Sequence, residues 1–205
     1  MIWPIGGQVA RRTKHSEAGL RHYTFWMTTS SLAPQQAAVI FHSIFLPALQ
    51  REHATTKKVI EAMPPDRGDY RPEPVAKTAI ELAWHIASSE KRFLEFVLTG
   101  EFGTGASNRP ENIRNGADIA RWYDETFASL LPQLQQLSPE QLARIIDFRG
   151  FLQQPAVTFL QTMMHHSAHH RGQLSTYLRP MGGKVPAIYG ESYDSAEAKK
   201  AQTVG

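Results

Sequence analysis

The amino-acid sequence predicts an all-α protein: a four-helix bundle with long connections and a short extra helix before the last long helix. Apolar residues recur every three or four positions in long stretches, which indicates amphipathic helices. Segments rich in Pro, Gly and Asn separate these stretches, and no alternation is long enough for a sheet. With 205 residues, of which 41% are hydrophobic, the chain can bury a sizeable core in one domain.

The first helix is expected to begin at Pro34, a residue that suits a first helical position. Its apolar positions continue to Met63, and Pro47 should kink or restart the helix because proline has no N–H. Residues 64–74 contain four prolines and are expected to form a long connection.

The second helix is expected over residues 75–99, with Gly100 as its C-terminal stop. A loop at 101–115 then leads to a third helix over residues 116–137, which Pro132 should end or bend.

Ser138-Pro139-Glu140-Gln141 is typical of a helix start, with Ser as the N-cap and Pro at the first position, and predicts the short extra helix. A brief extended turn at 145–152 follows, and the last long helix is expected over residues 155–179.

The two ends of the chain differ from the middle. We expect residues 1–33 to be a disordered N-terminal extension, 34–194 to be the folded domain and 195–205 to be a disordered polar tail. Residues 1–26 carry four basic residues and one acidic residue, a net charge of +3 that equals the charge of the whole chain. This segment is either an upstream extension of the reading frame, with Met27 as the start, or a targeting presequence; we favour the extension.

Composition excludes several classes of function. The chain has no cysteine, which rules out disulfides, Cys–zinc sites and a cysteine nucleophile. It has no apolar run of about 18 residues, so we expect no membrane partner and a cytoplasmic location. Beyond residue 26 the net charge is zero and no basic stripe is present, so we expect no nucleic-acid partner.

Four of the nine histidines fall in the last long helix, within His165–His170. Histidines four apart project from one helix face, at a spacing that lets two imidazoles share a metal ion. At about 100° per residue, His166 and His170 fall in the apolar stripe, whereas His165 and His169 fall towards the side or back. The inward pair is therefore either a pair of metal ligands or a pair of core histidines bonded to neighbouring side chains.

Three further histidines lie on the first two helices. His85 sits at the edge of an apolar stripe and, taken alone, is typical of a core-edge histidine. His42 and His53 lie on the first helix, where a lone histidine is more often structural or exposed than a ligand.

Three passages give the chain, from about Phe41 to Asp194, a resemblance to the DinB-like family, which includes thiol-dependent S-transferases and isomerases. They are Leu82–Glu90, the His-x-x-x-His-Arg-Gly-Gln motif within His166–Leu174, and the ending Tyr177–Gly190. The resemblance implies a four-helix bundle, one divalent metal ion held by His85, His166 and His170, and a homodimer.

Three neutral imidazoles would leave a metal ion with its full charge and an open position, as in catalytic zinc sites. Zinc and nickel both suit such ligands, and a bound thiol would be deprotonated. Because the chain has no thiol of its own, the resemblance implies a low-molecular-weight thiol cosubstrate and an electrophile that receives its sulfur. The alternatives are a metal-dependent hydrolase that uses bound water and a metal-binding dimer without catalysis.

Other polar residues are candidates for supporting roles. Ser89, Glu90, Asp147 and Gln173 could hold the second ring nitrogen of a ligand histidine. Arg171 either pairs with a substrate carboxylate or forms a structural ion pair.

Overall fold

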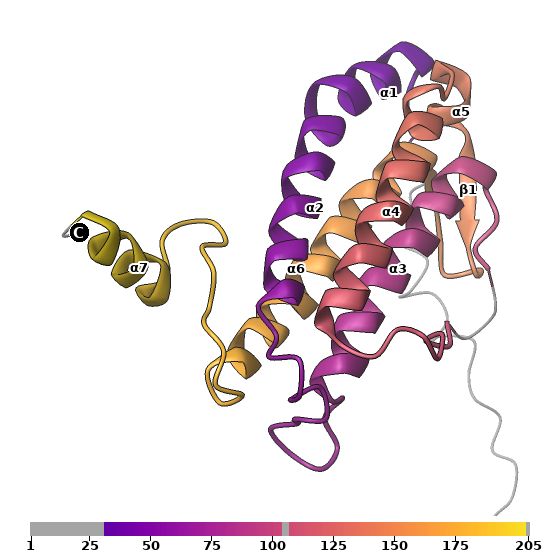
Figure 1. Cartoon of the computed structure of the whole chain (residues 1–205). Coiled ribbons are helices and arrows are strands. Elements are labelled where there is room, and N and C mark those ends of the chain that lie inside the picture. The colour runs from indigo at the N-terminus through magenta and orange to yellow at the C-terminus, as the bar shows by residue number, and fades with distance from the viewer. Residues whose placement is uncertain (1–30, 104–106, 204–205) are drawn as a thin grey trace, which may run out of the picture.

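The computed structural model describes residues 31–103 and 107–203 and confirms the all-α prediction (Figure 1). Four long helices stand side by side: α2 packs against α4 and α6, and α3 packs against the same two helices. The β-structure in the described part of the chain is one two-stranded hairpin. The elements are α1 Pro34–Ile40, α2 Leu46–Glu61, α3 Ala79–Thr99, α4 Gly116–Gln135, α5 Pro139–Ala143, β1 Ile145–Phe148, β2 Leu152–Pro155, α6 Phe159–Leu178 and α7 Tyr193–Thr203.

The predicted interruption at Pro47 is confirmed and takes the form of a π-helical turn, Phe41–Phe45, between α1 and α2. The N–H of Leu46 donates to the carbonyl of Phe41, five residues back. Pro47 has no N–H to continue the regular ladder, and it lies in the first turn of α2, where none is needed.

Helix α3 begins at Ala79, four residues later than predicted, because Thr78 and Glu81 form a capping box. The Thr78 hydroxyl accepts from the Glu81 N–H at 3.3 Å, and the Glu81 carboxylate accepts from the Thr78 N–H at 2.8 Å. The helix ends at Gly100 as predicted, with a φ of 86° that favours glycine.

Helix α4 begins at Gly116 as predicted and ends at Gln135, and Pro132 lies inside it. A Cβ at Gly116 would lie 2.6 Å from the carbonyl oxygen of Ile60, so only glycine lets α4 start this close to the end of α2.

The short helix α5 has the predicted Ser138 cap, whose hydroxyl accepts from the Gln141 N–H at 3.2 Å. The extended turn that follows is a β-hairpin, with Arg149 and Gly150 at positive φ in its loop. Helix α6 begins at Phe159 instead of Pro155, because Pro155 ends β2 and a 3₁₀ turn intervenes.

Residues 193–203 form helix α7 in place of the disordered tail predicted from residue 195, and α7 lies away from the four long helices (Figure 1). The hydroxyl of Ser192 accepts from the Ser195 N–H at 3.0 Å, which caps this helix. The prediction for residues 1–30, including the proposed start at Met27, lies outside the described residues.

The core has two apolar clusters, separated on helices α2, α3 and α6 by a layer of buried polar side chains. One cluster joins the α1 end of the bundle to α5 and the hairpin, and the other joins the end of α2 to the starts of α3 and α4. The buried polar residues between the clusters are His53, Thr56, Ser88, Glu90, Ser167 and Arg171.

A helix that crosses a membrane must be both long enough and sufficiently apolar along its length. Among the described residues, no helix meets both requirements.

Candidate metal centre

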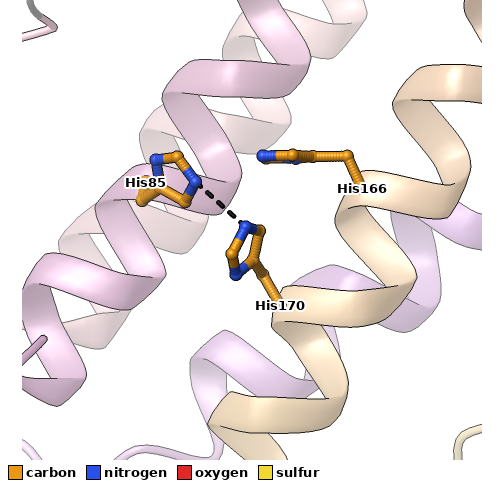
Figure 2. Close-up of side chains that lie close together, drawn as sticks. All are labelled: His85, His166 and His170. Atoms are coloured by element: carbon orange, nitrogen blue, oxygen red, sulfur yellow. Dashed lines mark hydrogen bonds between the residues drawn. The ribbon is translucent and has the colours of Figure 1, made fainter. Parts of the chain in front are cut away.

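Helices α3 and α6 bring His85, His166 and His170 together at the polar level of the bundle (Figure 2). Each of the three offers a ring nitrogen, and these nitrogens lie within 4.8 Å of one another. The Nε2 atoms of His85 and His170 are 3.2 Å apart. Three histidines from two helices thus converge on one point, with all three side chains partly buried.

The second ring nitrogens have different surroundings. Nδ1 of His170 donates to the Gln173 side-chain oxygen at 2.7 Å. In a neutral ring, Nε2 of His170 is then unprotonated and carries a lone pair. Nδ1 of His85 lies 3.5 Å from the Ser89 hydroxyl, the limit of a hydrogen bond. Nδ1 of His166 is buried and has no hydrogen-bond partner among the described residues. Gln173 is therefore the one supporting residue with a strong contact.

Burial and mutual repulsion keep these histidines neutral. Burial, followed by the nearby His170, lowers the pKa of both His85 and His166 to about 4. Burial also lowers the pKa of His170. The charged neighbours that act on the three pKa values within the described chain are all cationic, among them Lys77 and Arg92. At neutral pH the nitrogens carry lone pairs, and protons do not compete for them.

This donor set suits a divalent metal ion. Imidazole nitrogens bind zinc at about 2.0–2.1 Å, so two ligands in tetrahedral positions lie about 3.3 Å apart. The 3.2 Å between His85 and His170 matches that spacing. The triad contains no carboxylate, so an ion held there would keep its full charge.

The other histidines of these helices lie elsewhere. His165 and His169 are exposed, as the helical wheel predicted. His42 is exposed on the π-helical turn. His53 is buried, and its Nε2 lies 3.0 Å from the carboxylate of Asp124 on α4.

Comparison with known proteins assigns the chain to a family. The model of the DinB family matches residues 36–202, most of the chain. The chain belongs to the DinB family. The match extends past the predicted domain end at residue 194 and includes most of α7.

Relatives with DinB folds come from Bacillus. The uncharacterized protein YjoA of Bacillus subtilis (strain 168) is 30% identical over 129 residues, which cover 62% of this chain and 82% of that protein. The crystal structure of YjoA, a DinB-like protein, has a TM-score of 0.60 and 26% identity, and covers 72% of this chain and 99% of YjoA. A DinB-like protein from Bacillus cereus ATCC 10987 has a TM-score of 0.61 and 28% identity over 71% of this chain and 95% of its own.

Arg171, which follows His170 on α6, has its guanidinium buried inside the protein. It is 1% exposed and pairs with the Glu52 carboxylate on α2 at 2.7 Å. It also donates to the Thr56 hydroxyl at 3.0 Å and to the hydroxyl of Tyr189. Of the two predicted roles, the structural ion pair is the one present, because the guanidinium pairs with Glu52 inside the protein.

Two predicted supporting residues, Glu90 and Asp147, form their hydrogen bonds elsewhere in the described part of the chain. Glu90 is buried, and its carboxylate accepts from the Tyr123 hydroxyl at 2.5 Å. Burial raises the pKa of this carboxyl. Asp147 lies in the hairpin, where it accepts from the Gly150 N–H at 2.7 Å. Glu90 is bonded to Tyr123 of α4, and Asp147 is exposed on β1, so these roles depend on the folded structure and could not be read from sequence spacing.

Two pockets flank the triad. The larger, of about 620 Å³, includes His85 in its wall, and the smaller, of about 370 Å³, includes His170. Lys77 lines both. Arg92 lines the larger pocket and was missed in the sequence analysis, although its position seven residues after His85 places it on the same face of α3.

Proposed function

We propose that this DinB-family protein holds one divalent metal ion, zinc or nickel, through His85, His166 and His170. We further propose that it transfers the sulfur of a low-molecular-weight thiol to an electrophile. The observation that carries the proposal is the convergence of three neutral imidazole groups, of which His85 and His170 each line a pocket. Neutral imidazoles are the ligands of catalytic zinc sites, and nickel accepts the same donors.

A metal ion bound by these residues would supply Lewis acidity that lowers the pKa of a thiol, so that thiolate is present at neutral pH. The chain has no cysteine, so the sulfur must arrive on a cosubstrate. In the transfer, the thiol loses its proton, the sulfur forms a bond to the electrophilic carbon, and the leaving group departs with its bonding electron pair.

The residues of the chain would orient the ligand histidines, exclude bulk water and provide space for the substrates. Gln173 fixes the His170 ring with Nδ1 protonated and Nε2 directed at the site. The apolar clusters on either side of the polar level keep bulk water from the inner face of the triad. The two pockets that flank it offer separate space for a thiol and an electrophile.

The test measures formation of a thioether from 2-mercaptoethanol and 1-chloro-2,4-dinitrobenzene, with chloride as the leaving group. Zinc- and nickel-loaded protein should accelerate the reaction, and the His166→Gln/His170→Gln variant should return it to the uncatalysed rate. His165→Gln/His169→Gln changes the outward pair on the same helix and should keep full activity.

Equal rates for both double variants would contradict the proposal. Release of chloride without added thiol would instead favour hydrolysis by bound water. The cytoplasmic location and the homodimer stay predictions from the sequence.

A further inference from the structure

The pocket beside His85 has an unequal charge distribution. Its wall includes Lys77, Arg92 and Arg109, which are cationic, and Glu81 as its one acidic residue. The carboxylate of Glu81 is already engaged, because it caps α3 through the Thr78 N–H. The pocket therefore has three positive side chains and one negative side chain whose charge is shared with a helix N-terminus.

The three cations have no carboxylate partner within ion-pair distance among the described residues. Arg92 donates to the carbonyl of Gly103 at 2.6 Å, and its guanidinium lies 4.7 Å from the centre of the Phe102 ring. Arg109 donates to the carbonyl of Ile113. These contacts hold both guanidinium groups in place without neutralising them, and a guanidinium fixed in this way keeps free N–H donors for an anion.

The smaller pocket provides an internal comparison. It shares Lys77 with the larger pocket, but there Glu73 balances the charge. The excess of positive charge is thus confined to the side that holds His85.

We infer that the pocket beside His85 binds the anionic part of the substrate, so that a ligand entering there towards the triad carries a carboxylate or a similar negative group. This inference rests on the proposed function, because it assigns the ligand of the same site. The three cations in the wall of this pocket favour a negative ligand, because one acidic side chain does not balance their charge.

The experiment titrates zinc-loaded protein with 3-mercaptopropionate and with 3-mercaptopropionamide, using isothermal titration calorimetry. The two thiols differ only in a carboxylate and an amide. The wild type should bind the carboxylate at least about fivefold more tightly, and Lys77→Gln or Arg92→Gln should each reduce that preference about two- to fivefold. Added salt should reduce it as well. The affinity for the amide should not change in either variant.

Lys91→Gln is the matched control. Lys91 precedes Arg92 on α3, but it pairs with Glu95 and lines a different groove, between α3 and α4. Its replacement should leave the preference unchanged.

Three outcomes separate the claims. A preference for the carboxylate that Arg92→Gln weakens and Lys91→Gln does not supports the anion pocket. Equal binding of both thiols by the wild type overturns the anion pocket and leaves thiol binding at the metal intact. Binding of neither thiol by zinc-loaded protein overturns the proposed function and, with it, the anion pocket.

Discussion

His53 and the triad of His85, His166 and His170 lie at the same level of the bundle, but they differ in what surrounds them. The ring of His53 stacks on Phe127, with centres 3.9 Å apart, and its Nε2 reaches the carboxylate of Asp124. Lys57 binds the other oxygen of that carboxylate at 2.6 Å.

The triad has no carboxylate partner of this kind among the described residues. Its strongest internal contact joins two nitrogens, Nε2 of His85 and Nε2 of His170, and no carboxylate approaches it among the described residues. Burial lowers the pKa of every histidine in both places, so burial alone does not distinguish them. The difference lies in the hydrogen-bond partner. His53 has the carboxylate of Asp124, whereas the three ring nitrogens of the triad face one another.

The largest expected effect is the stabilisation by metal. Free zinc at about a thousand times its Kd should raise the free energy of unfolding of the wild type by about 4 kcal/mol. His53→Gln should keep this increment, and His166→Gln/His170→Gln should lose it. Urea denaturation with and without zinc measures the increment. Loss of the increment in His53→Gln alone would reverse the roles of the two sites.

The next effect is the pH dependence of the metal-free protein. The pKa values of His85 and His166 are about 4 in the folded protein and about 6.5 when unfolded, so the unfolded chain binds more protons between these values. The contribution of these two histidines to the free energy of unfolding is therefore fully present above about pH 6.5. It falls as the pH drops towards 4, by up to about 1.4 kcal/mol per pH unit for each histidine.

His85→Gln/His166→Gln should flatten this slope, and urea midpoints measured from pH 7 to 4.5 would reveal it. His53, whose pKa is also lowered, remains in both proteins and cancels in the comparison. Parallel curves for the two proteins would contradict the proposed neutrality of the triad.

Replacement of His53, which has its hydrogen-bond partner within the protein, should lower the free energy of unfolding with or without metal. His53→Ala loses the Asp124 contact and the packing on Phe127, and should lower the free energy of unfolding by about 1–3 kcal/mol. His170→Ala in metal-free protein should be close to neutral, because it removes a partly buried ring whose Nε2 faces other nitrogens. Thermal or urea unfolding compares the two. A larger cost for His170→Ala would mean that the triad stabilises the metal-free fold.

The smallest effect concerns the residue that orients His170. Gln173→Leu removes the acceptor at Nδ1 and should weaken zinc binding about tenfold without abolishing it. Gln161→Leu, an exposed glutamine on the same helix, is the control and should leave the affinity unchanged. Competition with a chromophoric chelator measures both. Equal affinities would mean that Gln173 does not orient the ring.

Local rules account for most of what the sequence predicted. The capping residue Ser138, the stop at Gly100 and the interruption near Pro47 act within a few positions, and the structure has all three features. The helical wheel separated His166 and His170 from the exposed pair because α6 is regular over this stretch. His85 joined the triad through the family resemblance, since spacing on one helix does not specify a neighbour on another.

The remaining features depend on contacts between distant segments. Arg171 finds Glu52 more than a hundred residues away, so its role could not be read from its neighbours on α6. The cationic pocket combines the connection before α3, α3 itself and the loop after it. The helix α7, predicted as a tail, shows the limit of composition: its polar sequence indicated disorder, but Ser192 supplies a cap.

The most direct test of the account is elemental metal analysis of three purified proteins after exposure to zinc or nickel without chelators: the wild type, His166→Gln/His170→Gln and His53→Gln. We predict close to one equivalent of metal in the wild type and in His53→Gln, and none in the double variant. Absence of metal from all three, or equal metal in all three, would contradict the assignment of the triad as the metal centre.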